Sequence, residues 1–218
     1  MPQIDEIAPD LNIAEWVQGE PSNISEQKGK LLIIKVFQVN CPGCFSLGFP
    51  EIIKLYKKNL GKPVVFWALA TAFEDFKFNS LDNLRKLILN REVVGETLIS
   101  LGRQGLLEGN HLSYSIPFPV AWDKIIPTKP EDADKNAKII IQRDFPAYTQ
   151  LPEHTQKKIS DQVFSYCINK KYTAETFENY QLRGTPSTIV IDKEGRLRCK
   201  LFGAGLGLEQ EIEKLLAE

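Results

Sequence analysis

NCPGC, residues 40–44, places two cysteines on either side of a proline and a glycine. Two cysteines at this spacing can bind a metal, form a structural disulfide or exchange electrons with another thiol. Directly before them runs LLIIKVF, residues 31–37, which is apolar except for Lys35. A continuous apolar run of this kind predicts a central parallel strand that is covered on both faces. We therefore expect a buried strand that ends where the cysteine pair begins.

The residues CPGC are suited to open a helix. With Cys41 at the N-cap, Pro42 takes the first helical position, where its missing N–H costs nothing. Gly43 and Cys44 then direct free N–H groups at the Cys41 sulfur, and the positive helix end favours a thiolate there. Lowering a cysteine pKa from about 8.5 to about 6.5 needs roughly 2.7 kcal/mol, and one charge-assisted hydrogen bond supplies roughly 1.5–3 kcal/mol. Cys41 is thus expected to attack a disulfide, and Cys44 to resolve the mixed disulfide.

Two other interpretations of the pair have less support. A zinc site needs four ligands, and the remaining cysteines and histidines are scattered singly along the chain. A disulfide across two residues closes a tiny loop, so it restrains the unfolded chain little. Redox exchange is therefore favoured, and neither a metal nor an organic cofactor is expected.

The rest of the chain alternates between strand and helix patterns. Apolar spacing after the cysteines predicts a helix that ends near Gly61, and SLDNLRKLILN, residues 80–90, predicts another with a Ser or Asp cap. Such alternation indicates an α/β layer fold. A charged, proline-punctuated stretch runs from Lys124 to about Asp144, and an amphipathic helix follows inside 153–170. The remaining predicted elements are strands near 14–17, at 64–70 and at 118–123, a β-hairpin from STIVID and RLRCKLFG, and a last helix in LEQEIEKLLA.

Composition excludes several classes of function. The chain has 218 residues, 43% of them hydrophobic and 25% charged, which is ordinary for a globular protein. A formal net charge of −1 gives no broad reason to bind nucleic acid or an anionic membrane. The start, MPQIDEIAPDL, lacks the positive end and apolar run of a signal peptide. We expect a cytoplasmic protein, in a reducing compartment where a close cysteine pair is catalytic or metal-binding rather than structural.

A second informative stretch is RGTPSTIVIDKEG, residues 183–195. Pro186 cannot donate to a ladder, so it belongs at the start of a strand or at an edge. A cis Thr185–Pro186 bond would leave the preceding backbone groups free to pair with an incoming extended segment. An ordinary trans proline that begins a strand is the simpler interpretation of this stretch taken alone.

Together these stretches make the chain resemble the thioredoxin-like redoxins, the branch of thiol-disulfide reductases and peroxiredoxin-related proteins. The matching segments are ISEQKGKLLIIKVFQVNCPGC, FPVAWD and RGTPSTIVIDKEGRL, in the family's order. The resemblance implies a single thioredoxin-like α/β domain over residues 1–218, with a mixed central sheet between helices and an α-helical insertion at 124–180. It also implies that Cys41 and Cys44 form the redox pair, that Pro186 is the cis-proline, and that Thr185 presents backbone to the partner.

The chain departs from the family at three places. Asn40 stands where many relatives have tryptophan, and Lys35 stands where thioredoxins usually have a buried acid. Pro50 follows Cys44 by six residues where five is usual, which predicts a local bulge near Gly48. Lys35 allows two interpretations: its head reaches water along the long stem, which is the simpler one, or its ammonium approaches Cys41 and lowers the thiol pKa.

The expected activity is thiol-disulfide exchange with a protein or small-molecule disulfide, with electrons from a thiol donor. A thiol peroxidase is the first alternative, but the peroxiredoxin pattern Pro-x-x-x-Thr/Ser-x-x-Cys fits neither Cys41 nor Cys44. A binding protein that uses the pair as a redox-gated switch, without turnover, is the second.

Overall fold

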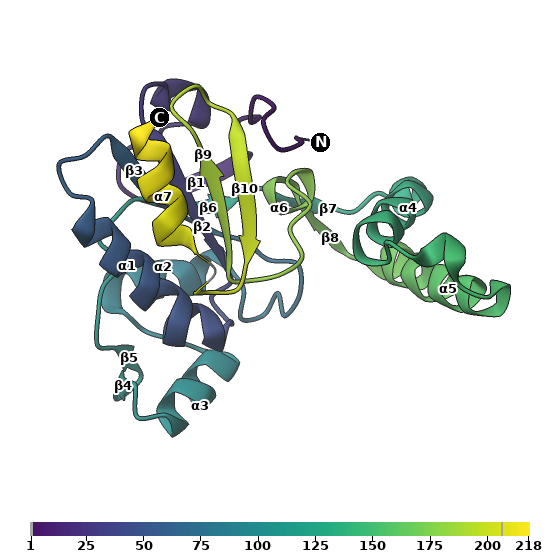
Figure 1. The fold of residues 1–218 in the computed structure, drawn as a ribbon. Coiled ribbons are helices and arrows are strands. Elements are labelled where there is room, and N and C mark those ends of the chain that lie inside the picture. The colour runs from purple at the N-terminus through teal and green to yellow at the C-terminus, as the bar shows by residue number, and fades with distance from the viewer. Residues whose placement is uncertain (1, 206) are drawn as a thin grey trace. The chain divides into compact units, whose positions relative to one another are not determined.

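The computed structural model describes residues 2–205 and 207–218. The chain clusters into two compact units, one of residues 1–125 with 174–218 and the other of residues 126–173 (Figure 1). We describe each unit by itself.

The first unit is built on a six-stranded mixed sheet with the order β1-β6-β3-β2-β9-β10. Strands β2, β3 and β6 are parallel, while β1 and β9 run antiparallel to their neighbours β6 and β2, and β10 runs antiparallel to β9. All seven residues of β2 are buried, which confirms the predicted central strand. The strands are β1 Ile13–Gln18, β2 Leu31–Phe37, β3 Val64–Ala70, β6 Val120–Asp123, β9 Ser187–Ile191 and β10 Leu197–Phe202.

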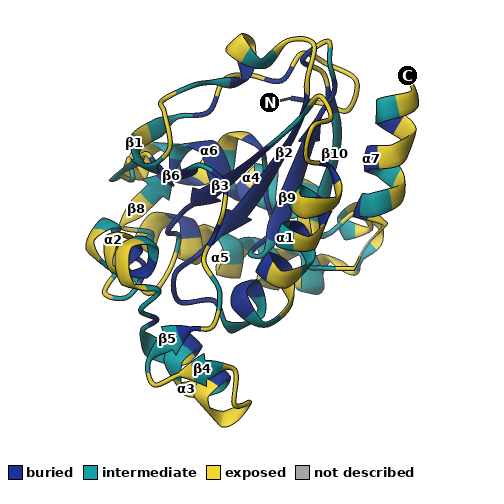
Figure 2. Cartoon of the chain, turned by 90° about the vertical axis from the view of Figure 1, so that its left-hand side faces the viewer, coloured by how far each residue is buried: buried dark blue, intermediate teal, exposed yellow. Residues whose placement is uncertain are grey.

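Helices cover both faces of this sheet, as expected of a thioredoxin-like α/β fold. Helices α1, α2 and α7 contribute buried side chains to one core, and α6 and the N-terminal segment contribute to the other. In Figure 2 the strands carry the dark blue of buried residues, whereas the helices turn exposed residues outward. The bounds are α1 Phe49–Lys58, α2 Leu81–Asn90, α3 Gly95–Arg103, α6 Glu175–Asn179 and α7 Leu208–Ala217, with a short 3-10 helix at Ile24–Gln27.

Alternation along β2 decides which side chains meet the cysteines. Leu31, Ile33 and Phe37 point into the core that contains α1, Cys41 and Cys44. Leu32, Ile34 and Val36 point into the opposite core. Because side chains alternate along a strand, Lys35 shares the face of Ile33 and Phe37. The one charged side chain of β2 therefore lies beneath the helix that carries the cysteines.

Two regions differ from the expectation. Residues 91–117, in which no element was predicted, contain helix α3 and a small hairpin of β4 (Leu107–Glu108) and β5 (His111–Leu112). The charged stretch before Asp144 contains helix α4, Ala133–Asp144, in addition to the helix that was predicted inside residues 153–170. The apolar stripe of α4 consists of Ala133, Ala137 and Ile140, at spacing i, i+4 and i+7, and its two alanines make the pattern weak in the sequence.

The second unit is a helical hairpin. Its helices are α4 and α5 (Glu153–Asn169), and the two-stranded sheet of β7 (Ile125–Pro127) and β8 (Tyr172–Ala174) lies at its base. Short 3-10 helices occur at Pro130–Asp132 and Tyr148–Gln150. Its small core consists of Ala133, Ala137 and Cys167, with Ile140 and Val163 packed against them.

Among the described residues, no helix combines the length and the apolar character that crossing a bilayer requires.

Candidate redox site

Cys41 and Cys44 form a disulfide at the start of a helix, with their Cα atoms 5.3 Å apart. Helical backbone begins at Pro42, directly after Cys41, as predicted. The Cys44 N–H donates to the Cys41 Sγ at 3.2 Å, whereas across residues 2–205 and 207–218 no such bond from Gly43 is found. Cys41 is 8% exposed and Cys44 is 0% exposed. Cys41 is therefore less open than expected, but it is the more exposed residue of the pair.

The turn that follows the cysteines is a π-helix, Cys44–Gly48. Its closing bond runs from the Phe49 N–H to the Cys44 carbonyl, five residues back. A π-turn accommodates one extra residue within a helix, and such turns occur frequently at functional sites. This confirms the bulge that the spacing of Pro50 predicted near Gly48. Leu47 of this turn is 64% exposed.

The second predicted segment lies against this turn. The Thr185–Pro186 peptide bond is cis. A Cβ atom on Gly48 would lie 3.2 Å from Pro186 Cβ, so the π-turn and the proline are in close contact. The Pro186 carbonyl accepts from the Gly203 N–H at 2.8 Å. Within the described part of the chain, the Thr185 backbone makes no hydrogen bond, which leaves its N–H and C=O available to another molecule.

Lys35 is inside the protein rather than at its surface. The residue is 1% exposed, and its Nζ donates to Thr188 Oγ1 at 3.1 Å. A Cβ on Gly48 would lie 3.1 Å from Lys35 Cε, so the end of the lysine stem lies beside the turn of the cysteines. Burial lowers the pKa of Lys35 from 10.5 to about 8, against a raising effect of the Glu51 carboxylate. The interpretation that its head reaches water is wrong, because Thr188 on β9 offers an acceptor inside.

Asn40, which stands where many thioredoxin-like proteins have tryptophan, has a structural role. Its Oδ1 accepts from the Glu96 N–H at 2.7 Å and, more weakly, from the Thr97 N–H at 3.4 Å. Its own N–H donates to Asn79 Oδ1 at 2.7 Å, and its Nδ2 donates to Asp75 Oδ2 at 3.1 Å. Asn40 thus caps α3 from outside that helix, as an N-cap side chain does from within. This remote cap explains why local sequence signals missed α3.

Tyr114 is a second residue of the site that the sequence did not single out. Its hydroxyl donates to the Phe45 carbonyl at 2.6 Å, within the π-turn. Burial raises the pKa of the Tyr114 hydroxyl, so it remains a donor at physiological pH. A π-turn leaves carbonyls imperfectly satisfied, and a tyrosine outside the turn can supply the missing donor.

The remaining cysteines are separate from this site. Cys167 is buried in the helical hairpin, and Cys199 lies on β10. Burial raises the pKa of the Cys199 thiol to about 11, which keeps it protonated and unreactive. In the described ranges no group of three or more His, Cys, Asp or Glu side chains is arranged to hold a metal ion.

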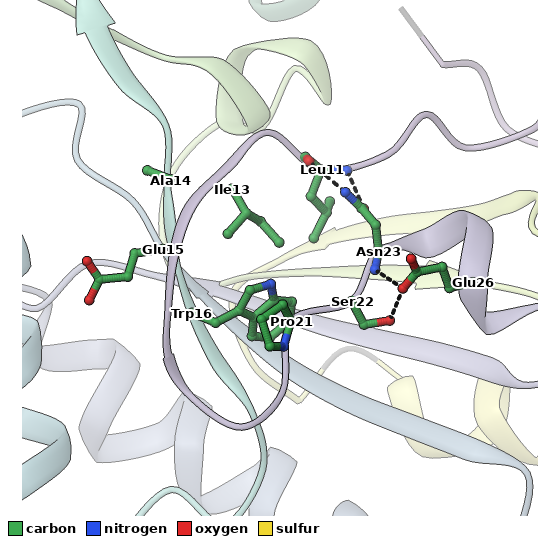
Figure 3. A pocket seen from close by; sticks show the side chains of 9 residues that line it. All are labelled: Leu11, Ile13, Ala14, Glu15, Trp16, Pro21, Ser22, Asn23 and Glu26. Atoms are coloured by element: carbon green, nitrogen blue, oxygen red, sulfur yellow. Dashed lines mark hydrogen bonds between the residues drawn. The ribbon is translucent and has the colours of Figure 1, made fainter.

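A surface pocket lies away from the cysteines, along β1 and the loop after it (Figure 3). Its apolar lining includes Ile13, Trp16 and Pro21. Asn23 and Glu26 also line it, and the Asn23 N–H donates to Glu26 Oε2. Neither cysteine lines it, so it is not part of the redox site.

Comparisons with known proteins agree with this geometry. No family model and no curated protein sequence matches the chain. A crystal structure described as a thioredoxin-like superfamily protein is 25% identical, with a TM-score of 0.59 over 97% of both chains. A thiol-disulfide isomerase from Corynebacterium glutamicum is 23% identical, with a TM-score of 0.58 over 98% of this chain and 97% of that one. The chain therefore has a thioredoxin-like fold.

Proposed function

We propose that the protein is a thiol-disulfide oxidoreductase in which Cys41 attacks and Cys44 resolves. The observation that carries the proposal is the disulfide at a helix start, in which Cys41 is 8% exposed and Cys44 is 0% exposed. A peptide N–H already points at the Cys41 sulfur, and the same donor would stabilise a thiolate after reduction. This asymmetry supports the two roles, because a partner approaches the more exposed Cys41 more easily than the buried Cys44.

The reaction follows from these roles. The Cys41 thiolate attacks one sulfur of the partner's disulfide, and the other partner sulfur leaves as a thiolate. The Cys44 thiol then loses its proton and attacks the Cys41 sulfur. The bond between Cys41 and the partner breaks, its electron pair leaves with the partner's sulfur, and the Cys41–Cys44 disulfide forms. Two electrons pass from the protein to the partner, whose disulfide becomes two thiols.

We assign recognition of the partner to the backbone at Thr185 and Pro186. The unpaired N–H and C=O of Thr185 can bond to an extended polypeptide, as an edge strand does. Pro186 packs on Gly48 of the π-turn and so holds this backbone beside the turn of the cysteines. A disulfide-containing protein is therefore the proposed substrate class, with small disulfides as poorer substrates that lack this backbone.

The donor and the compartment complete the proposal. A thiol donor returns two electrons to the disulfide by the reverse exchange, without an organic or metal cofactor. In a reducing cytoplasm the working direction is reduction, and we propose that location. These two points rest on the chemistry of the pair and on the sequence.

The experiment compares three activities of the purified protein with dithiothreitol as donor. We expect reduction of insulin disulfides, slower reduction of glutathione disulfide, and peroxide consumption near background. Peroxide consumption that exceeds disulfide reduction would favour the peroxidase instead. Absence of turnover on either disulfide, together with partner binding that changes on oxidation, would favour a redox-gated binding protein. A Cys44→Ser variant should retain partners on Cys41 as mixed disulfides, and a Cys41→Ser variant serves as the matched control.

A further inference from the structure

Lys35 is a buried titratable group that the exchange reaction, as written, does not use. It is 1% exposed on the sheet face that packs against the cysteine helix. A lysine amine is costly to bury with its charge, and natural proteins reserve such positions for specific purposes. Its location beside the turn that begins at Cys44 suggests what that purpose is.

The polar surroundings of the amine are sparse. Nζ has one hydrogen-bond partner among the described residues, the Thr188 hydroxyl on β9. The opposite neighbour on β3 is Ala68, which offers no polar side chain. From α1 the Glu51 carboxylate acts on the amine at longer range, with no ion pair between them in the described ranges, and Glu51 Oε1 accepts from the Gly205 N–H at 2.9 Å. Among the described residues, no ion pair stabilises the ammonium form of Lys35.

Loss of the proton is therefore accessible near neutral pH. Burial brings the pKa of Lys35 to about 8 in the disulfide form. With that pKa, about a tenth of the molecules carry a neutral amine at pH 7. A group of this kind can accept and return a proton during a catalytic cycle, which a lysine with an unperturbed pKa cannot do efficiently.

The exchange reaction has one step that needs such a group. Cys44 is 0% exposed, so water does not reach its thiol directly. Burial also disfavours a thiolate there, whereas Cys41 has a peptide N–H directed at its sulfur. The resolving step therefore requires a base inside the protein, on the face of the sheet that Cys44 contacts.

We propose that the Lys35 amine is this base. In its neutral form it takes the proton from the Cys44 thiol and becomes an ammonium. The Cys44 thiolate then attacks the Cys41 sulfur, the mixed disulfide breaks, and the partner leaves as a thiolate that receives a proton from the ammonium or from water. Gly48 leaves room for the lysine stem beside the turn that begins at Cys44, because a side chain there would press on Lys35 Cε and Pro186. This role rests on the proposed function and assigns the proton of its second step.

The test separates the two steps with 5,5′-dithiobis(2-nitrobenzoate) as the probe. Reduced protein releases one coloured thiolate when Cys41 attacks and a second when Cys44 resolves. In Lys35→Met, which keeps the length of the stem, we expect the first release to stay within about twofold and the second to slow by roughly tenfold or more near pH 7. The acidic limb of the second step, which follows a pKa of about 8 in the parent, should move to higher pH.

Two further variants make the result decisive. Thr188→Val removes the acceptor of the ammonium and should move the limb to lower pH, because the charged form loses its hydrogen bond. Lys54→Met changes an exposed lysine of α1 and should leave both releases unchanged. A second release that is unaffected in Lys35→Met, or one slowed equally at every pH, overturns the proposal. If Lys35→Met does not fold, an unmoved limb in Thr188→Val overturns it. Absence of the first release in the parent protein would instead refute the oxidoreductase function itself.

Discussion

The sheet unit and the helical hairpin of residues 126–173 differ greatly in how many of their side chains are buried. Strand β2 buries all seven of its residues, with side chains in a core on each face of the sheet. Helix α5 has seventeen residues, of which Cys167 alone is buried. Phe164, Tyr166 and Ile168 of the same helix are exposed. A layer between two cores is held in place by its neighbours, whereas a hairpin with three buried side chains depends on its own helices.

The proposed redox site lies in the unit with the larger core. Every residue of the proposed site, from Lys35 through the cysteines to Pro186, lies in the sheet unit. The bonds that fix the site reach it from distant segments, namely from Asn40 to α3 and from Tyr114 to the π-turn. Such cross-links need a framework that does not open locally, and strands buried on both sides have this property.

The largest expected effect separates the cysteines of the two units. Cys41→Ser removes the nucleophile and should lower disulfide reductase activity by roughly a hundredfold or more. Cys167→Ser, in the hairpin core, should leave the activity within about twofold, because that thiol is outside the site. Insulin reduction measured on both variants provides the comparison. Equal losses of reductase activity in the two variants would contradict the assignment of the redox site to the sheet unit.

The second expected effect is a difference in the free energy of unfolding between variants in the core of the sheet unit and in the core of the hairpin. Ile34 is 0% exposed and faces away from the cysteines, so Ile34→Ala should reduce the free energy of unfolding by about 2–5 kcal/mol. Val163 in the hairpin is only partly buried, and Val163→Ala should cost about 1 kcal/mol. Urea denaturation monitored by tryptophan fluorescence would measure both. A larger loss for Val163→Ala would mean that the hairpin core matters more than its burial indicates.

The third expected effect is a pH dependence of the free energy of unfolding, caused by a buried carboxyl group of the sheet unit. Asp123 of β6 is 0% exposed, and burial raises its pKa from 3.8 to about 6 despite hydrogen bonds from Thr71 and from the N–H groups of Thr176 and Phe177. The folded protein therefore holds a proton that the unfolded chain has released. This contribution to stability is complete below about pH 4 and is lost as the pH rises through about 6, by at most about 3 kcal/mol.

The measurement is the free energy of unfolding at several pH values for the parent protein and for Asp123→Asn. The difference in pH dependence between the two should lie between about pH 4 and 6. Parallel curves over this range would show that the Asp123 carboxyl is ionised in the folded protein throughout.

Removal of the hairpin should have the smallest effect on the chemistry. The Glu175 N–H donates to the Lys124 carbonyl at 2.9 Å, so the sheet unit brings the two ends of the hairpin together. Replacing residues 126–173 by a short glycine-serine linker should keep the rate with dithiobis(nitrobenzoate) within about twofold. A folded deletion variant that has lost the reaction with this small probe would contradict the assignment of the site to the sheet unit alone.

The sequence predicted the elements whose signals are local. Strands β2 and β3 and helix α7 match their apolar runs, and the spacing of Pro50 correctly indicated the π-turn. The parts that it missed depend on distant partners. Helix α3 has its cap on Asn40, more than fifty residues earlier. The position of Lys35 inside the protein depends on Thr188, which only the antiparallel pairing of β2 with β9 places opposite it.

The most direct test of the central claim is the thiolate titration of Cys41 in the reduced protein. Alkylation by iodoacetamide, followed by mass spectrometry of the modified residue, gives the rate as a function of pH in a Cys44→Ser background. The helix start and the N–H of residue 44 predict a pKa well below the usual value of about 8.5 and rapid alkylation near neutral pH. An ordinary thiol pKa with slow alkylation would contradict the account, because Cys41 would then be no better a nucleophile than any cysteine.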